Sequence, residues 1–140
     1  MTDVTNGTTG RSGWNIGLWV AQALLAAFYF YAGFNKVSQP IEALAAMSMG
    51  FVLFVPEWLT RFIGVAELLG AVGIVLPALI RIMPRLTPLA ALGLSIIQVL
   101  AILLHASRGE FAVLPLNVVL LALSLFVLWG RERKAPIAAR

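Results

Sequence analysis

One acidic residue, Glu67, lies inside a long run of apolar residues and is the first candidate for chemistry. A carboxyl group in such a run is costly, so it is expected to face other helices and to find a partner or a proton. Lys36 closes the preceding apolar run, and we expect its ammonium group to contact Glu67. Both are therefore candidate catalytic groups for proton transfer. The alternative is a structural ion pair that only ties two helices together.

Four more polar residues are candidates for binding a ligand: Tyr29, Gln98, His105 and Asn117. At the rise of a helix, Tyr29 lies about 10 Å below the lysine that closes its run. Gln98 lies about 10 Å below His105, and Asn117 about 9 Å below the start of its run. With the carboxyl group at about 12 Å, four helices each place one polar group at a similar depth. This pattern predicts a pocket for a lipophilic molecule with a small polar head; the alternative is mutual bonding that holds helices together.

The composition of the chain is that of a membrane protein. Of its 140 residues, 61% are hydrophobic and 11% are charged, whereas soluble domains carry roughly a quarter charged residues. A small globule cannot bury so much apolar surface, so the composition excludes a soluble enzyme, a nucleic-acid-binding domain and a disordered chain. The lipid bilayer is the expected partner. The net charge of +4 is assigned to membrane topology rather than to nucleic acid.

The metal-binding residue types are scarce. The sequence has no cysteine and a single histidine, His105. Disulfide exchange, iron–sulfur ligation and a two-histidine metal or haem site within one chain are thereby excluded. We expect no metal site and no covalently bound cofactor.

Four apolar blocks are each close to the length of about 20 residues that crosses a bilayer as a helix. They cover residues 14–34, 59–80, 86–105 and 111–129. The connections 81–85 and 106–110 are short, which forces antiparallel neighbours. The sequence therefore predicts an all-α membrane protein, an antiparallel bundle of four transmembrane helices over 14–130. A disordered cytoplasmic lead over 1–13 and a basic cytoplasmic tail over 131–140 flank this domain.

The stretch 35–58 is too polar and too short to span a bilayer. It carries apolar residues between Pro40 and Pro56, and it is predicted to form an interfacial helix over one mouth of the bundle. A plain loop is the alternative.

The distribution of Lys and Arg predicts the orientation. One side of the membrane receives seven of them: Arg11, Arg81, Arg85, Arg131, Arg133, Lys134 and Arg140. The other side receives Lys36, Arg61 and Arg108. The positive-inside rule therefore places both termini in the cytoplasm, where the basic run from Arg131 to Lys134 would meet anionic headgroups. The inner half of the bundle is expected to hold Gln22 and Ser124 but no charge. Glu57 and Arg61, four residues apart, are expected to form a surface pair.

Two motifs resemble the DoxX-like family of small membrane proteins. They are Ala-Gly-Phe-Asn-Lys over residues 32–36 and Gly-Val-Ala-Glu-Leu-Leu-Gly-Ala over residues 64–71. Val37 departs from the leucine that the family often has after the lysine. The resemblance covers nearly the whole chain after Trp14, and the family pattern matches Lys36 and Glu67.

The resemblance implies a location in the bacterial cytoplasmic (inner) membrane and a link to redox chemistry. The family's namesake is a small membrane subunit of thiosulfate:quinone oxidoreductase, and other relatives accompany redox or detoxification proteins. Three hypotheses follow. The first is a membrane subunit of an oxidoreductase that binds a quinone-like or isoprenoid molecule and receives electrons from a membrane or soluble redox protein. The second is a structural or assembly subunit that packs against a larger complex. The third is a stand-alone enzyme that uses Glu67 on a lipophilic substrate. The sequence leaves a homo-oligomer open.

Overall fold

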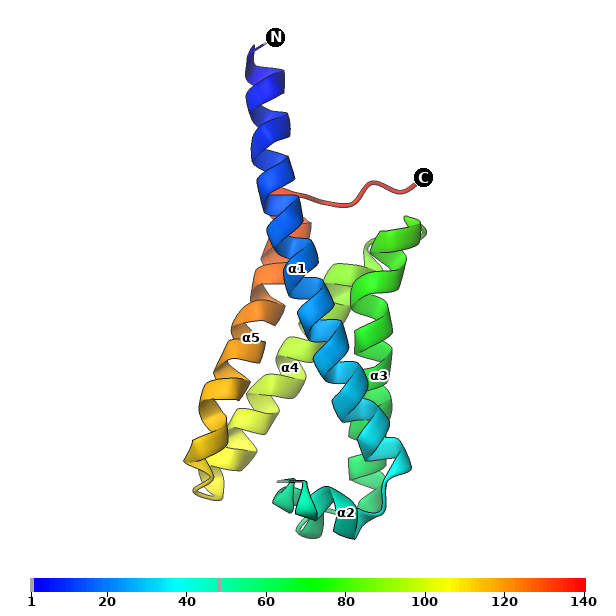
Figure 1. The fold of residues 1–140 in the computed structure, drawn as a ribbon, viewed down its shortest axis with the longest axis vertical. Helices are drawn as coiled ribbons and strands as arrows, with labels where there is room; N and C mark the ends of the chain where they lie inside the picture. The colour runs from blue at the N-terminus through cyan, green and yellow to red at the C-terminus, as the bar shows by residue number, and fades with distance from the viewer. Residues whose placement is uncertain (1, 48) are drawn as a thin grey trace.

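The computed structural model describes residues 2–47 and 49–140, with side chains from residue 13 onward. Four long helices form the bundle, and the described residues contain no strand (Figure 1). The helices are α1 (Thr2–Ser38), α3 (Glu57–Ile80), α4 (Leu86–Ser107) and α5 (Leu114–Trp129). Four segments are long and apolar enough to cross a membrane: Gly13–Ser38, Glu57–Ile80, Leu86–Ser107 and Phe111–Lys134. The predicted all-α architecture with four spans is confirmed.

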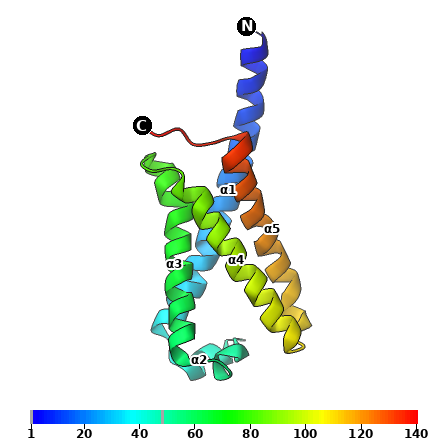
Figure 2. The ribbon, with the colours of Figure 1, turned by 180° about the vertical axis from the view of Figure 1, so that it is seen from behind.

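The four helices pack in a closed cycle in which α1 contacts α3, α3 contacts α4, α4 contacts α5, and α5 contacts α1. In Figure 1, α1 crosses the front of the molecule from α5 to α3. Behind it, α4 runs the other way, from α3 to α5, as Figure 2 shows. We call the end that carries the C-terminal residues and the α3–α4 connection the terminal end, and the opposite end the loop end. Buried side chains at the centre include Leu25, Tyr29, Ile74 and Leu94.

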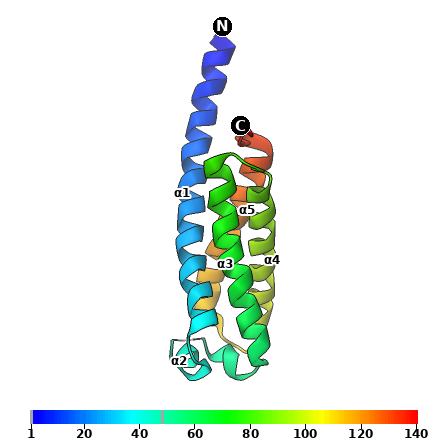
Figure 3. The ribbon, with the colours of Figure 1, turned by 90° about the vertical axis from the view of Figure 1, so that its right-hand side faces the viewer.

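Two short helices cross the loop end of the bundle, α2 (Ile41–Ala46) and the 3-10 turn η1 (Gly50–Leu53) (Figure 3). Their side chains form a small buried cluster that packs against Leu104 of α4. Arg108, at the end of α4, places its guanidinium 4.0 Å from the ring centre of Phe54. The stretch therefore connects the α1–α3 side of the bundle to the end of α4. It covers the mouth as two short helices rather than one, and its contact with the membrane surface stays a prediction.

The two ends of the chain lie at the terminal end of the bundle. Helix α1 begins at Thr2, and its first turns project beyond the bundle (Figures 1 and 3). These turns include residues 2–13, for which the sequence predicts a disordered lead. The disorder of this segment in water stays a prediction. At the other terminus, the helix continues through a π-helical turn, η3 (Gly130–Lys134). The last residues then cross the terminal end to Arg81, whose carbonyl accepts from the Arg140 amide at 3.0 Å.

Candidate functional site

The ion pair between Lys36 and Glu67 is the first feature of the candidate site. Lys36 lies in the last turn of α1, and its Nζ is 2.7 Å from Oε1 of Glu67 on α3. Only 10% of the lysine side chain and 4% of the glutamate side chain are exposed. The predicted contact is confirmed. Two opposite charges in hydrogen-bond contact satisfy each other where water is scarce, which is the arrangement that charged residues adopt inside membranes.

Two glycines let the helices approach closely enough for this pair. A Cβ on Gly33 would lie 2.7 Å from the carbonyl oxygen of Gly64. A Cβ on Gly64 would lie 2.8 Å from the Cβ of Lys36 and 3.0 Å from the carbonyl oxygen of Gly33. Real side chains do not tolerate such distances, so α1 and α3 touch backbone to backbone beside the ion pair. The two motifs singled out in the sequence therefore form one structural unit.

Arg61 fixes the end of α1 above this unit. Its Nη1 donates to the carbonyl oxygens of Lys36 at 2.8 Å and of Gln39 at 2.6 Å. Lys36 lies in the last turn of α1 and Gln39 directly follows the helix, where intrahelical donors run out. The Nη2 of Arg61 pairs with Glu57 Oε1 at 3.0 Å, so the predicted i,i+4 pair is confirmed. Arg61 thus holds the backbone that carries the buried lysine.

A second polar contact, between Tyr29 and Gln98, crosses the centre of the bundle. The Gln98 Nε2 on α4 donates to the Tyr29 hydroxyl on α1 at 2.5 Å. Tyr29 is completely buried, and Gln98 is nearly so. The Oε1 of Gln98 is buried without a hydrogen-bond partner among the described residues. Tyr29 and Gln98, which the sequence places at one depth, are therefore in contact. The amide oxygen of Gln98 accepts no hydrogen bond from a described residue.

Asn117 and His105 lie apart from these contacts. Asn117 is 7% exposed on α5, and no described residue forms a hydrogen bond with its buried Nδ2. His105 faces the loop end, where its Nδ1 lies 3.0 Å from Glu110 Oε1 and its ring meets Phe51 edge-on. That hydrogen bond, assisted by Arg108, lowers the pKa of the Glu110 carboxyl. The structure therefore assigns His105 to the loop that closes α4, not to the buried polar layer.

The buried groups divide into satisfied and unsatisfied ones. The lysine and glutamate satisfy each other and can exchange a proton within one hydrogen bond. The amide oxygen of Gln98 and the amide nitrogen of Asn117 are an acceptor and a donor without protein partners in the described part of the chain. A buried polar atom without a partner costs about 1–3 kcal/mol, so such atoms call for an explanation. Within the described residues, no cluster of three or more His, Cys, Asp or Glu could hold a metal ion.

Arg131 is a buried charge that the sequence reasoning missed. We expected it on a solvated basic tail and expected no charge in the inner half of the bundle; both expectations are wrong, because Arg131 is 3% exposed. Its Nε donates to Gln22 Oε1 at 2.7 Å and its Nη1 to Asn15 Oδ1 at 2.8 Å. Arg131 lies four residues after Val127 and seven after Ser124, so it continues the buried face of α5 into the turn that follows Trp129. The signal in the sequence was Gln22, an amide in an apolar span that needs a partner.

The sequence profile of the DoxX-like family matches residues 20–127, which is most of the chain and includes the whole buried polar layer. This chain therefore belongs to the DoxX-like family and is a multi-pass membrane protein. Comparisons with curated proteins and with solved structures gave no significant match.

Proposed function

We propose that this DoxX-like protein is a membrane subunit of a redox complex and that it binds the polar head of a quinone-like or isoprenoid molecule in the loop-end half of its bundle. The observation that carries the proposal is the presence of two buried amide atoms without partners. They are Gln98 Oε1 and Asn117 Nδ2, on the neighbouring helices α4 and α5. A ligand that both accepts and donates hydrogen bonds would satisfy them and remove the cost of their burial.

The residue types fit such a ligand. A quinone carbonyl oxygen accepts hydrogen bonds, which suits the amide nitrogen of Asn117. The hydroxyl of the reduced form donates, which suits the amide oxygen of Gln98. The apolar interior around Leu25 and Leu94 suits an isoprenoid chain. When bound, a quinone would supply the capacity to take up or release electrons and protons in the membrane.

Glu67 and Lys36 are the groups to which we assign the proton. The short hydrogen bond between them lets a proton be shared or passed on without water. Lys36 also keeps the carboxylate paired when no ligand is present, so the charge never stands alone in lipid. Electrons come from a partner protein in this proposal, since a chain with no cysteine and one histidine offers few ligands for a redox metal.

Binding of decylubiquinone to the purified protein in nanodiscs tests the proposal. Native mass spectrometry counts the bound molecules, and quenching of the intrinsic tryptophan fluorescence gives the affinity. Gln98→Leu and Asn117→Leu should each weaken binding about tenfold, which corresponds to one lost hydrogen bond. Glu57→Gln is the matched control for Glu67→Gln. Both carboxylates lie on α3, but Glu57 is exposed whereas Glu67 is buried.

The result that contradicts the proposal is the absence of saturable binding, or binding that both leucine variants leave unchanged. Proton transfer has its own readout. Glu67→Gln should retain decylubiquinone but slow its reduction in membranes that contain the redox partner, whereas Glu57→Gln should not. Unchanged reduction by a folded Glu67→Gln protein would remove the proposed role of this carboxyl group.

A packing or assembly subunit is the second candidate. The observation in its favour is that Lys36 and Glu67 satisfy each other, beside the close contact of Gly33 with Gly64. In that case Glu67→Gln would lower the stability of the larger complex and leave decylubiquinone without effect on the protein. A stand-alone enzyme would instead turn over a lipophilic substrate without any partner.

We also propose that the terminal end faces the cytoplasm of a bacterial inner membrane. The support is the excess of Lys and Arg at that end. Because the chain has no cysteine, one introduced cysteine is enough to test this. In intact cells, a membrane-impermeant maleimide should label Ser107→Cys at the loop end and leave Ala139→Cys unlabelled. The reverse pattern would invert the orientation.

A further inference from the structure

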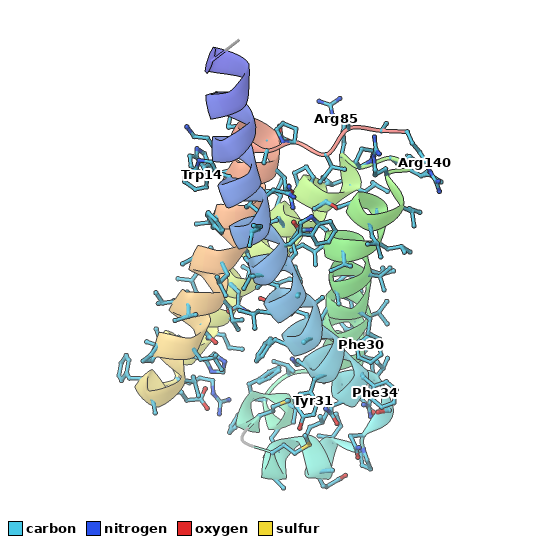
Figure 4. All side chains as sticks on the ribbon, turned by 45° about the horizontal axis from the view of Figure 1, so that its top comes forward. Trp14, Phe30, Tyr31, Phe34, Arg85 and Arg140 are labelled. Carbon is cyan, nitrogen blue, oxygen red and sulfur yellow. The ribbon has the colours of Figure 1, made fainter. Side chains whose placement is uncertain are left out.

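A pocket of about 220 Å³ lies at the terminal end of the bundle, far from the polar layer of the loop-end half. Its walls come from the start of α4, from the π-helical turn η3 and from the C-terminal segment that crosses this end. Two arginines, Arg85 and Arg131, contribute to the walls. Arg131 is buried, whereas Arg85 is exposed beside the C-terminal segment (Figure 4).

The charge of Arg131 lacks an anionic partner among the described side chains. Its hydrogen bonds to described residues go to neutral oxygens: the side chains of Gln22 and Asn15 and the carbonyl of Ala135. Its second terminal nitrogen, Nη2, is buried and has no hydrogen-bond partner in the described part of the chain. Burying a guanidinium with neutral partners only is costly, and charges in such places are normally paired. Arg131 therefore has one unused donor and one uncompensated positive charge, and its side chain contributes to the wall of a pocket.

Four of the other lining residues have apolar side chains. Three prolines, Pro84, Pro88 and Pro136, and the side chain of Ile137 line the pocket. Glu132 is the one carboxylate among the lining residues, and it is exposed. A free inorganic ion gains little from apolar walls, whereas a phosphate that is attached to carbon atoms can use both the arginines and the prolines.

The pocket also lies where phospholipid headgroups would be. It is at the end of the membrane-spanning segments, and Trp14 and Trp129 pack against each other near η3 with their ring centres 5.1 Å apart. Tryptophan side chains are enriched at the level of the headgroups. Basic pockets between transmembrane helices are a known geometry for binding anionic headgroups.

We propose that this pocket binds a phosphate group, with Arg131 as the buried anchor and Arg85 as the second cation at the rim. A guanidinium suits phosphate because its planar array of N–H donors can make two parallel hydrogen bonds. The phosphate belongs either to an anionic phospholipid or to a soluble phosphate compound, and both offer the same oxygen acceptors. The site is independent of the proposed quinone site, because it shares no residue with it.

The tryptophan at position 19 provides a local signal for the test. The Cζ of Arg131 lies 5.3 Å from the ring centre of Trp19, so a ligand that moves the guanidinium should change tryptophan emission. We would titrate the full-length protein in phosphatidylcholine nanodiscs with inorganic phosphate at constant ionic strength. In parallel, nanodiscs of phosphatidylcholine with increasing phosphatidylglycerol would supply the lipid source, and native mass spectrometry would count the retained lipids.

Arg85→Gln and Arg133→Gln form the matched pair of variants. Both remove one exposed positive charge from the same end of the bundle, and only Arg85 lines the pocket. Arg85→Gln should weaken the probe's binding about tenfold, the loss expected for one charged hydrogen bond, while Arg133→Gln should leave it unchanged. Arg131→Lys tests the anchor, provided that its circular dichroism shows a folded protein. If Arg131→Lys does not fold, the comparison of Arg85→Gln with Arg133→Gln still decides the proposal.

Each outcome decides the proposal. Saturable binding of phosphatidylglycerol but not of inorganic phosphate supports the site with a lipid as its source. Saturable binding of inorganic phosphate, sensitive to Arg85→Gln, supports a soluble source. Equal weakening by Arg85→Gln and Arg133→Gln would mean general attraction to a charged surface and would overturn the proposal. The absence of saturable binding of either probe would overturn it as well.

Discussion

Removing one member of the Lys36–Glu67 pair should destabilise the protein far more than removing both. The change Glu67→Gln preserves the size of the side chain but leaves Lys36, whose side chain is only 10% exposed, without its counter-charge. Breaking a buried pair in this way costs about 3–5 kcal/mol, because the remaining charge is uncompensated. Lys36→Met leaves the buried carboxylate alone and should cost a similar amount.

The double variant Lys36→Met/Glu67→Gln removes both charges and should recover much of this loss. Replacing a buried ion pair by uncharged groups of similar volume is often close to neutral. Because the double variant should cost less than either single variant, the coupling free energy must exceed the loss from one single change, about 3–5 kcal/mol, in favour of the intact pair. Glu57→Gln on the same helix is the control, and its exposed pair with Arg61 should be worth less than about 1 kcal/mol.

The measurement is reversible unfolding in mixed micelles, with the denaturing detergent as the variable and tryptophan fluorescence and helical circular dichroism as the signals. The four proteins of the cycle, measured under one condition, give the coupling directly. If the effects of the single changes add to within about 0.5 kcal/mol, the two groups do not interact in the folded protein. The assignment of the pair as a joint proton-holding unit would then be wrong.

Two further predictions concern helix approach and acid stability. Gly64→Ala puts a methyl group 2.8 Å from the Lys36 Cβ, so it should destabilise the protein by about 1–3 kcal/mol; Gly93→Ala, with no atom within 4 Å, should not destabilise it in the same unfolding assay. The lowered pKa of Glu110 predicts that its contact with His105 stabilises the fold fully above the ordinary carboxyl pKa of 4.5 and loses this effect as pH falls through its lower folded value. Glu110→Gln should therefore lose less stability between neutral and acidic pH than the wild type; an identical pH profile would contradict this.

The sequence was sufficient for the number, type and approximate bounds of the spans. Each apolar block is long enough to cross a bilayer, and lipid leaves the backbone no alternative to a helix. The contact between Lys36 and Glu67 was also predictable, because a charge inside a membrane-spanning run requires a counter-charge at the same depth. The glycine motifs beside both residues gave a second, independent indication that the two helices touch.

Residue spacing gives depth along a helix but not the direction in which a side chain points across the bundle. Tyr29 and Gln98 share a depth and meet, whereas Asn117 shares that depth without a bond to either residue. The crossing of α1 and α4 determines this difference, and it depends on how all four helices pack (Figures 1 and 2). Hydrophobic periodicity carries no information on a crossing angle.

The buried arginine shows a second limit of sequence reasoning. The run from Arg131 to Lys134 has the composition of a solvated tail, and a regular helix or an extended chain would expose most of it. The buried residues Ser124 and Val127 of α5 lie seven and four positions before Arg131, so the helix that continues past Trp129 carries Arg131 on the same inward face while its C-terminal neighbours stay exposed. Gln22 then becomes informative, because its amide bridges that guanidinium and the carbonyl oxygen of Ile74 on α3.

The two ends of the bundle treat buried charge in different ways, and this difference separates the two proposals. At the loop end, the ammonium of Lys36 has a carboxylate partner within the chain, so that charge needs no ligand to be stable. At the terminal end, the guanidinium of Arg131 has only neutral partners among the described residues and one unused donor, and Arg131 lines a pocket. A ligand that bears a negative charge therefore gains more at the terminal end, whereas an uncharged head group that both donates and accepts fits the unpaired amides of the loop-end half.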